Sequence, residues 1–195
     1  MCCRYSLGSD PLDERVRKIL SLMERDYPGQ YKVGEIFPGD TAMAILGENG
    51  RLRHAPAVFG FPGFGKNQLI LNARAETVES RQTFARAFRE RRAILPADGF
   101  YEWSHDGKKT KYLFTLDGPR TLYLCGLYQW FNGAYRFVIL TRPANDSVID
   151  IHDRMPVIAS ADEVREYLTD YNAAKEIVAV SNPFLQREKV ESAKE

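Results

Sequence analysis

Short turn-forming pairs divide the second half of the chain into strand-length apolar runs. The runs span residues 92–105, 110–116, 121–130 and 135–141. The pairs between them are Asp106-Gly107, Asp117-Gly118 and Asn132-Gly133. Asn-Gly and Asp-Gly accept the positive φ angles that tight hairpins need, so successive runs are expected to be antiparallel neighbours. Asn49-Gly50 separates two earlier runs in the same way. A mostly antiparallel sheet is therefore the main constraint on the fold.

Helical periodicity appears in three places. We predict helices over 11–26, 75–92 and 161–168, with Phe84 and Phe88 one turn apart in the second. A strand over 176–181 and a frayed polar tail over 187–195 complete the pattern. The 195 residues suit one domain, here 1–186. We predict an α+β fold whose sheet is closed or nearly closed into a barrel with flanking helices.

Composition excludes several classes of protein. The formal net charge is +1, so an anionic partner would need a local basic patch. No run reaches the roughly 18–20 apolar residues of a membrane span, and the first thirty residues are too charged for a secretory signal. The three cysteines include no C-x-x-C pair, and no metal or cofactor is expected. We expect a cytoplasmic protein with reduced thiols.

Cys2 directly follows Met1 and precedes Cys3. Methionine is normally removed before a small residue, which would leave Cys2 with an α-amine and a thiol on adjacent carbons. Unperturbed pKa values of about 7.7–8.0 for an α-amine and about 8.5 for a thiol lie within reach of modest tuning. Such a 1,2-aminothiol converts an aldehyde to an imine and then to a thiazolidine. A buried structural cysteine and a lipidated Cys2-Cys3 pair are the alternatives.

Three further segments carry side chains suited to chemistry. In "LNARAET", Asn72 could orient a reacting group and Arg74 could hold an anion, or the segment could only cap a helix. In "PADGFYEWS", Glu102 either points to solvent or is buried with a raised pKa suited to proton transfer. In "IHDRMPVI", His152 is an acid–base candidate or a hydrogen-bonded structural histidine. No single segment decides between these interpretations.

Together the four segments resemble the SRAP family, the SOS response-associated peptidase domain proteins that sense abasic sites in single-stranded DNA. The family pattern begins Met-Cys-Gly-Arg and continues with "NARAET", "PADGFYEW" and "HDRMP". The matching positions are Cys2 with Arg4, then 72–77, 96–103 and 152–156. The resemblance extends to about Asn182 and implies a β-rich single domain with a barrel-like sheet, in agreement with the pattern above.

The resemblance also implies a substrate and a role for each residue. A ring-opened abasic site is an aldehyde, so Cys2 would capture it as a thiazolidine and form a durable DNA–protein crosslink. Asn72 would hold the cysteine or the sugar oxygens, Glu102 would move protons near the new amine, and His152 would be the general acid. Exposed aromatic rings would stack on bases. The phosphate ligands would be Arg4, Arg74 and Arg154.

The resemblance sets further expectations for partners and differs in detail from the family pattern. We expect a monomer that binds single-stranded DNA with abasic sites and is associated with the nucleoid when bound. Cys3 replaces the usual glycine, and Phe59-Gly60-Phe61 replaces Trp-Gly-Leu. Ala85 follows Phe84 where the family often has arginine. These differences bear on DNA affinity and junction preference more than on the reaction.

Three other function classes fit part of the pattern. An N-terminal-nucleophile amidohydrolase would use the α-amine of Cys2 as the base for its own thiol. A peptidase is suggested by the family's name, and removal of Met1 could itself be autocatalytic. A non-covalent module that binds single-stranded DNA would leave the N-terminal cysteines without a chemical role.

Overall fold

The structure is a computed structural model that describes residues 2–11, 13–105, 107–118, 120–180 and 182–190. Its α-helices are α1 (Glu14–Asp26), α2 (Gln82–Glu90), α3 (Val164–Thr169) and α4 (Tyr171–Ala179), with a 3₁₀ helix at Ala75–Thr77. Its strands are β1 (Tyr5–Leu7), β2 (Gly34–Ile36), β3 (Thr41–Glu48), β4 (Arg51–Phe59), β5 (Phe61–Pro62), β6 (Leu69–Ile70), β7 (Asn72–Arg74), β8 (Arg92–Ala97), β9 (Gly99–Trp103), β10 (Lys111–Thr115), β11 (Leu122–Phe131), β12 (Ala134–Pro143), β13 (Arg154–Pro156), β14 (Ile158–Ala159) and β15 (Gln186–Lys189). In these ranges no helix is long and apolar enough to cross a membrane.

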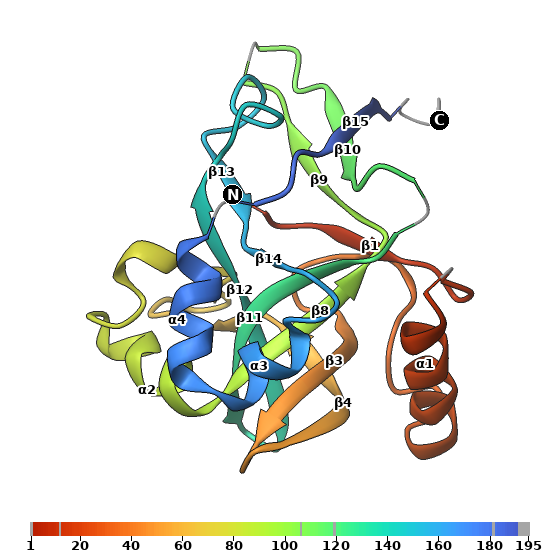
Figure 1. The fold of residues 1–195 in the computed structure, drawn as a ribbon, viewed down its shortest axis with the longest axis vertical. Helices are drawn as coiled ribbons and strands as arrows, with labels where there is room; N and C mark the ends of the chain where they lie inside the picture. Colours follow the sequence, from red (N-terminus) through yellow and green to blue (C-terminus); the bar gives the residue numbers. More distant parts are fainter. Residues whose placement is uncertain (1, 12, 106, 119, 181, 191–195) are drawn as a thin grey trace.

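The larger sheet closes on itself through five strands. Strand β12 pairs antiparallel with β11 and parallel with β4, and β3 and β8 complete the ring. A second, antiparallel sheet has the order β15-β10-β9-β1-β2. The predicted α+β class is therefore confirmed, and sheet closure takes the form of this ring of five strands (Figure 1).

The hairpin prediction is confirmed at the turns with Asn-Gly sequences. It is wrong at Asp117-Gly118, because β10 pairs with β9 and β15, whereas β11 belongs to the larger sheet. Asn49 and Gly50 have φ angles of 52° and 72° between β3 and β4. Asn132 and Gly133 have φ angles of 46° and 87° between β11 and β12. Positive φ at both central residues is the geometry that matches the twist of paired strands, which explains why these strands turn back at these positions.

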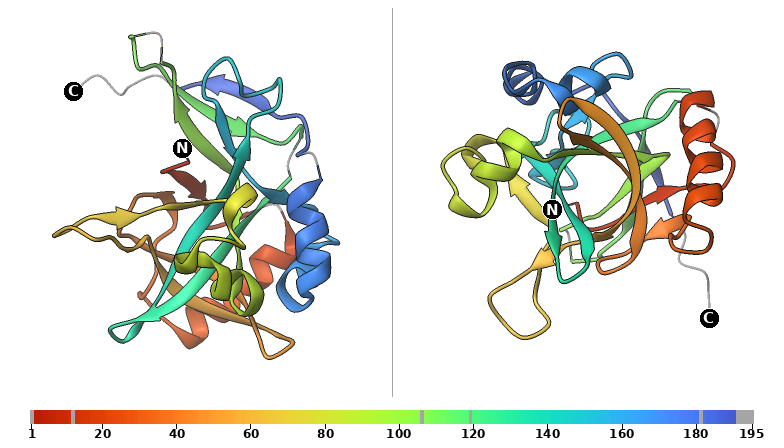
Figure 2. Two further views of the ribbon diagram at one scale, coloured as in Figure 1. Left: turned by 90° about the vertical axis from the view of Figure 1, so that its left-hand side faces the viewer. Right: turned by 90° about the horizontal axis from the view of Figure 1, so that it is seen from below.

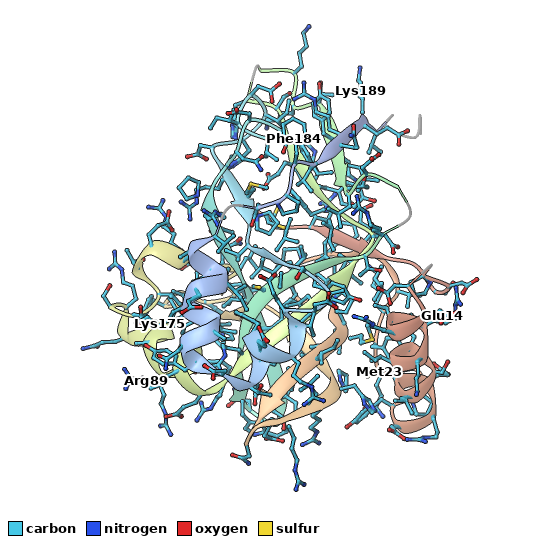
Figure 3. The ribbon with its side chains drawn as sticks, in the orientation of Figure 1. Glu14, Met23, Arg89, Lys175, Phe184 and Lys189 are labelled. Carbon is cyan, nitrogen blue, oxygen red and sulfur yellow. The ribbon has the colours of Figure 1, made fainter. Side chains whose placement is uncertain are left out.

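Residues on both faces of the ring are buried, and they form two hydrophobic clusters. Inside the ring, Phe59 and Phe137 stack with centroids 5.0 Å apart, and Tyr5 from β1 packs edge-on against both. Outside it, helices cover the sheet, with α1 on one side and α2 and α4 on the opposite side (Figure 1). Met23 faces the body of the molecule from α1, whereas Glu14 lies at the helix exterior (Figure 3).

Two predicted segments have a different structure. The helix expected over 75–92 is divided into the 3₁₀ helix and α2, and Phe84 packs against Phe61 while Phe88 packs against Tyr171. The strand expected over 176–181 is wrong, because Tyr171–Ala179 is helical. The Asp170 side chain caps this helix by accepting from the backbone N–H of Ala173, which sets a helical register before the apolar run begins.

The polar stretch expected to fray from residue 187 instead begins within a strand. Residues Gln186–Lys189 form β15, which pairs antiparallel with β10 from Tyr112 to Thr115. The β-sheet therefore provides backbone hydrogen bonds that the local polar composition does not predict. The rest of the expected tail, 191–195, lies outside the described residues.

Candidate functional site

Antiparallel pairing brings the start of the chain beside Glu102. In the small sheet Tyr5 is opposite Phe100, and the backbone N–H of Tyr101 donates to the carbonyl of Arg4 at 2.9 Å. Because the two strands are antiparallel, the residues before Tyr5 lie beside the residues after Phe100, which include Glu102. Cys2, just before β1, is fully buried.

Asn72 fixes the backbone of Cys2 from the larger sheet. Its Nδ2 donates to the carbonyl oxygen of Cys2 at 3.0 Å. Asn72 is the first residue of β7, which pairs with β12, so its position is set by the ring. Asn72 therefore contacts the cysteine, which is one of the two partners that the family resemblance implies for it.

Glu102 is buried rather than pointing to solvent, with 3% of the residue exposed. Burial raises its pKa to about 7. Burial also raises the pKa of the Cys2 thiol well above its ordinary value, and the charge of Glu102 raises it further. A carboxyl group that titrates near neutral pH beside Cys2 can both take and give a proton.

His152 reaches the same region from the segment before β13. Its side chain is 12% exposed, and its Nδ1 accepts from the backbone N–H of Arg154 at 2.9 Å. Burial lowers the pKa of His152. The charge of its neighbour Asp153 raises the pKa of Glu102, so the two segments are electrostatically coupled.

Arg154 is buried, and its side chain binds other groups of the protein. It is 8% exposed, its guanidinium contacts both carboxylate oxygens of Glu76, and Nη2 also donates to the carbonyl of Thr141 at 2.7 Å. The pair lowers the pKa of Glu76. A phosphate at Arg154 would have to displace the Glu76 carboxylate, and the geometry instead ties the "NARAET" segment to the "HDRMP" segment.

Arg4 and Arg74 are placed differently. The Arg4 guanidinium lies over Phe37 and Trp103, 4.2 and 4.8 Å from the ring centroids, and pairs with Glu35 at 3.2 Å. Lys111 binds the same Glu35 carboxylate at 2.6 Å. Arg74 is exposed at the end of β7. A positive and aromatic surface therefore borders the buried residues.

Several buried polar atoms at this site have no hydrogen-bond partner among the described residues. They include Arg4 Nε, Tyr5 Oη, Asn72 Oδ1 and Arg154 Nε. All four belong to segments that meet near Cys2. Unsatisfied buried polar atoms are rare in proteins, so each of these atoms is available to a water molecule or to a polar group of a ligand. Tyr5 was not predicted from the sequence, because its position in an apolar strand is typical of a core residue.

The aromatic residues at the family's Trp-Gly-Leu position are not exposed. Phe59 and Phe61 are both buried, at 0% and 1% exposed. Phe64, by contrast, is 98% exposed in the loop between β5 and β6, and Lys66 follows it. This hairpin projects from the body of the molecule (Figure 2). An aromatic ring between two glycines is the sequence signal that could have identified it.

Other features of the described residues do not form part of this site. A cavity of about 600 Å³ is lined by residues that include Asp13, Tyr123 and Ile158, but by none of the predicted site residues. We place the site at Cys2 because its unsatisfied and titrating groups converge there. Across the described ranges, no group of three or more His, Cys, Asp or Glu side chains could hold a metal ion.

The chain is similar in sequence to a known family and to characterised relatives. The family described as SOS response associated peptidase (SRAP) matches residues 1–194. The abasic site processing protein YoqW of Bacillus subtilis is 32% identical over 186 residues, covering 88% of this chain and 82% of the relative. The abasic site processing protein YedK of Escherichia coli is 29% identical, covering 90% and 83%.

Solved structures agree with the fold. A phage-related protein from Bordetella bronchiseptica superposes with a TM-score of 0.75 at 26% identity, covering 98% of this chain and 95% of the other. A protein from Bacteroides thetaiotaomicron reaches 0.76 at 18% identity, with 97% and 92% covered, and supports the fold alone. Both comparisons extend over nearly the whole chain.

Proposed function

The chain belongs to the SOS response associated peptidase (SRAP) family, and on this premise we propose that it captures abasic sites in single-stranded DNA covalently through Cys2. Two relatives that this chain matches over 82% and 83% of their length are named abasic site processing proteins. The observation that carries the proposal is the convergence on Cys2 of a buried carboxyl group with a pKa of about 7 and a positioning amide.

The reaction begins after Met1 is removed. The abasic sugar opens when Glu102 takes the proton of the anomeric hydroxyl and protonated His152 gives a proton to the ring oxygen. The Cys2 amine then adds to the aldehyde carbon, and loss of water gives an imine. The Cys2 thiol adds to the imine carbon, its proton passes to the nitrogen, and a thiazolidine is formed.

Burial suits this sequence of steps. A thiol with a raised pKa stays protonated until it attacks, so it does not repel the Glu102 carboxylate. Glu102 can take the thiol proton as sulfur adds to the imine carbon and pass it to the nitrogen. Asn72 holds the Cys2 carbonyl, and its free Oδ1 can accept from the Cys2 amine or a sugar hydroxyl. A site with little water also protects the imine from hydrolysis until the ring closes.

DNA binding is assigned to groups around the buried ones, of which Arg74 and Phe64 are exposed and Arg4 and Lys111 are half-buried. Arg74 and the Arg4–Lys111 surface are assigned to phosphates, and Phe64 to base stacking. Arg154 was expected to be a phosphate ligand as well, but its pair with Glu76 supports a role in holding the two catalytic segments together. We propose that one chain suffices for capture.

The decisive experiment mixes purified protein with single-stranded DNA that carries one abasic site. Intact mass measures Met1 loss and the adduct, and a denaturing gel tests its heat stability. Wild type without Met1 should form the adduct and Cys2→Ala should not. Cys3→Ala is the matched control, because it removes the neighbouring thiol and leaves the aminothiol intact. Equal adduct formation by Cys2→Ala, or none by wild type without Met1, would overturn the proposal.

The peptidase description of the family points to a second candidate activity, removal of Met1 by the chain itself. The buried carboxyl of Glu102 near Cys2 supports it, because hydrolysis of the Met1–Cys2 bond needs a group that can activate water. Protein made in cells without methionine aminopeptidase activity should then still begin at Cys2, whereas Glu102→Gln should retain Met1. Retention of Met1 by wild type in those cells would exclude self-processing.

A further inference from the structure

A second histidine lies against His152. His105 is in the loop between β9 and β10, and its ring centroid is 4.9 Å from that of His152, with the planes tilted by 58°. His105 is exposed, whereas the His152 side chain is 12% exposed. The family motifs end at Trp103 and begin again at His152, so the resemblance assigns His105 no role. In the sequence it has the character of a turn residue.

The surroundings of His152 define two protonation states. In the neutral ring, Nδ1 accepts from the backbone N–H of Arg154 at 2.9 Å, so the proton lies on Nε2. In the protonated ring, Nδ1 carries a proton that can bind Asp153 Oδ1, which lies 2.9 Å away. The switch between these contacts needs little movement. The balance therefore depends on nearby charges.

Charged groups near His152 come from more than one segment. Asp153 is on its own segment, and the mature chain would add the α-amine of Cys2. His105 is on the loop that packs against it, and two imidazoles in contact repel each other when both are protonated. This repulsion adds to burial in lowering the pKa of His152.

We propose that His105 is a positioning residue that limits protonation of His152 and thereby sets the pH range in which the general acid is active. The inference rests on the proposed function for its catalytic consequence. Only protonated His152 can donate to the sugar ring oxygen or assist reversal of the crosslink. When both rings carry a proton, contact with His105 therefore makes the acid form of His152 scarcer and slows both opening and release.

The first test is an NMR titration of the His152 ring, which does not require crosslinking. In His105→Gln the midpoint should move to higher pH, because removing a like charge makes protonation easier. Partly exposed charge pairs of this kind change an equilibrium by about 1.5- to 5-fold. His54→Gln is the matched control, because His54 binds Asp26 at 2.8 Å on another part of the molecule. An unchanged midpoint in His105→Gln would overturn the inference.

The second test measures the single-turnover rate of adduct formation against pH. His105→Gln should shift the alkaline limb of the profile to higher pH by the same factor and leave the acid limb, which reports ionisation of Glu102, unchanged. The shift should vanish when His152→Gln is also present. An equal fall in rate at all pH values would indicate that His105 has only a structural role and would contradict the inference. Absence of an adduct alongside a shifted NMR midpoint would reject the proposed function but not the coupling.

Discussion

The residues around Cys2 and the hairpin between β5 and β6 are built on opposite principles. Around Cys2, polar and titratable groups are buried, and Glu102 is 3% exposed. At the hairpin, an apolar ring is exposed, and Phe64 is 98% exposed. Each region reverses the ordinary rule that apolar groups lie inside and polar groups outside. The first region can change pKa values, and the second can offer stacking surface.

On the proposed function, the contrast separates chemistry from DNA binding within one chain. Desolvation needs surrounding structure, and Glu102 obtains it from the small sheet beside the ring. Stacking needs accessibility, and Phe64 obtains it from a hairpin that extends away from both sheets (Figure 2). Substitutions in the first region should therefore change rate and pH dependence, and those in the second should change affinity.

The largest effect is expected from Glu102→Gln. Replacing the carboxyl group removes proton transfer but retains shape, so the single-turnover rate of adduct formation should fall by about 10²- to 10⁴-fold. DNA affinity, measured by fluorescence anisotropy with undamaged single-stranded DNA, should stay unchanged. A large loss of affinity with an unchanged rate would reverse the division between the two regions.

The same substitution should make stability less sensitive to pH. Burial raises the pKa of Glu102 from 4.5 to about 7, so the folded state holds a proton that the unfolded state releases. Wild type should lose up to roughly 3 kcal/mol of unfolding free energy as pH rises from 4.5 to above 7. Urea unfolding at pH 5 and pH 8 should show that the unfolding free energy of Glu102→Gln, relative to that of wild type, is higher at pH 8 than at pH 5. No gain would show that the carboxyl group is hydrated.

Phe64→Ala should weaken binding to single-stranded DNA. Stacking of one base on an aromatic ring contributes about 1–3 kcal/mol, so the Kd should rise by about 5- to 150-fold. The rate at saturating DNA and the melting temperature should not change, because the ring has no buried contacts to lose. Trp130→Ala is the control, as Trp130 is 59% exposed on the separate β11–β12 hairpin. Equal losses for both variants would count against a specific role for the β5–β6 hairpin.

The smallest effect is expected from Arg74→Gln. Removing one phosphate contact should lower the magnitude of the slope of log K against log salt by about 0.7 for a single strand. Arg89→Gln tests the same charge change at the outer surface of α2 (Figure 3). If the slope changes equally in both, general charge rather than contact explains it. An unchanged slope in Arg74→Gln would remove Arg74 from the phosphate ligands.

The sequence predicted those features that local chemistry controls. Asn49-Gly50 and Asn132-Gly133 specify hairpins because few other pairs accept positive φ at both positions. The α1 helix was predictable because its apolar face repeats at helical spacing. The prediction of a strand over 176–181 was wrong because a short apolar run fits a buried strand and a buried helix equally well. The N-cap at Asp170 favours the helix.

The candidate site residues come from the sequence, but their environments could not be predicted from it. Order and spacing in four segments identify a family and thereby nominate Cys2, Asn72, Glu102 and His152 as candidates. Only the tertiary structure decided that Glu102 is buried, that Arg154 pairs with Glu76 and that His105 touches His152. Burial and pairing depend on strands brought together from distant parts of the chain. The sequence specifies each side chain directly. The burial of a side chain and the charged groups beside it depend on the tertiary structure.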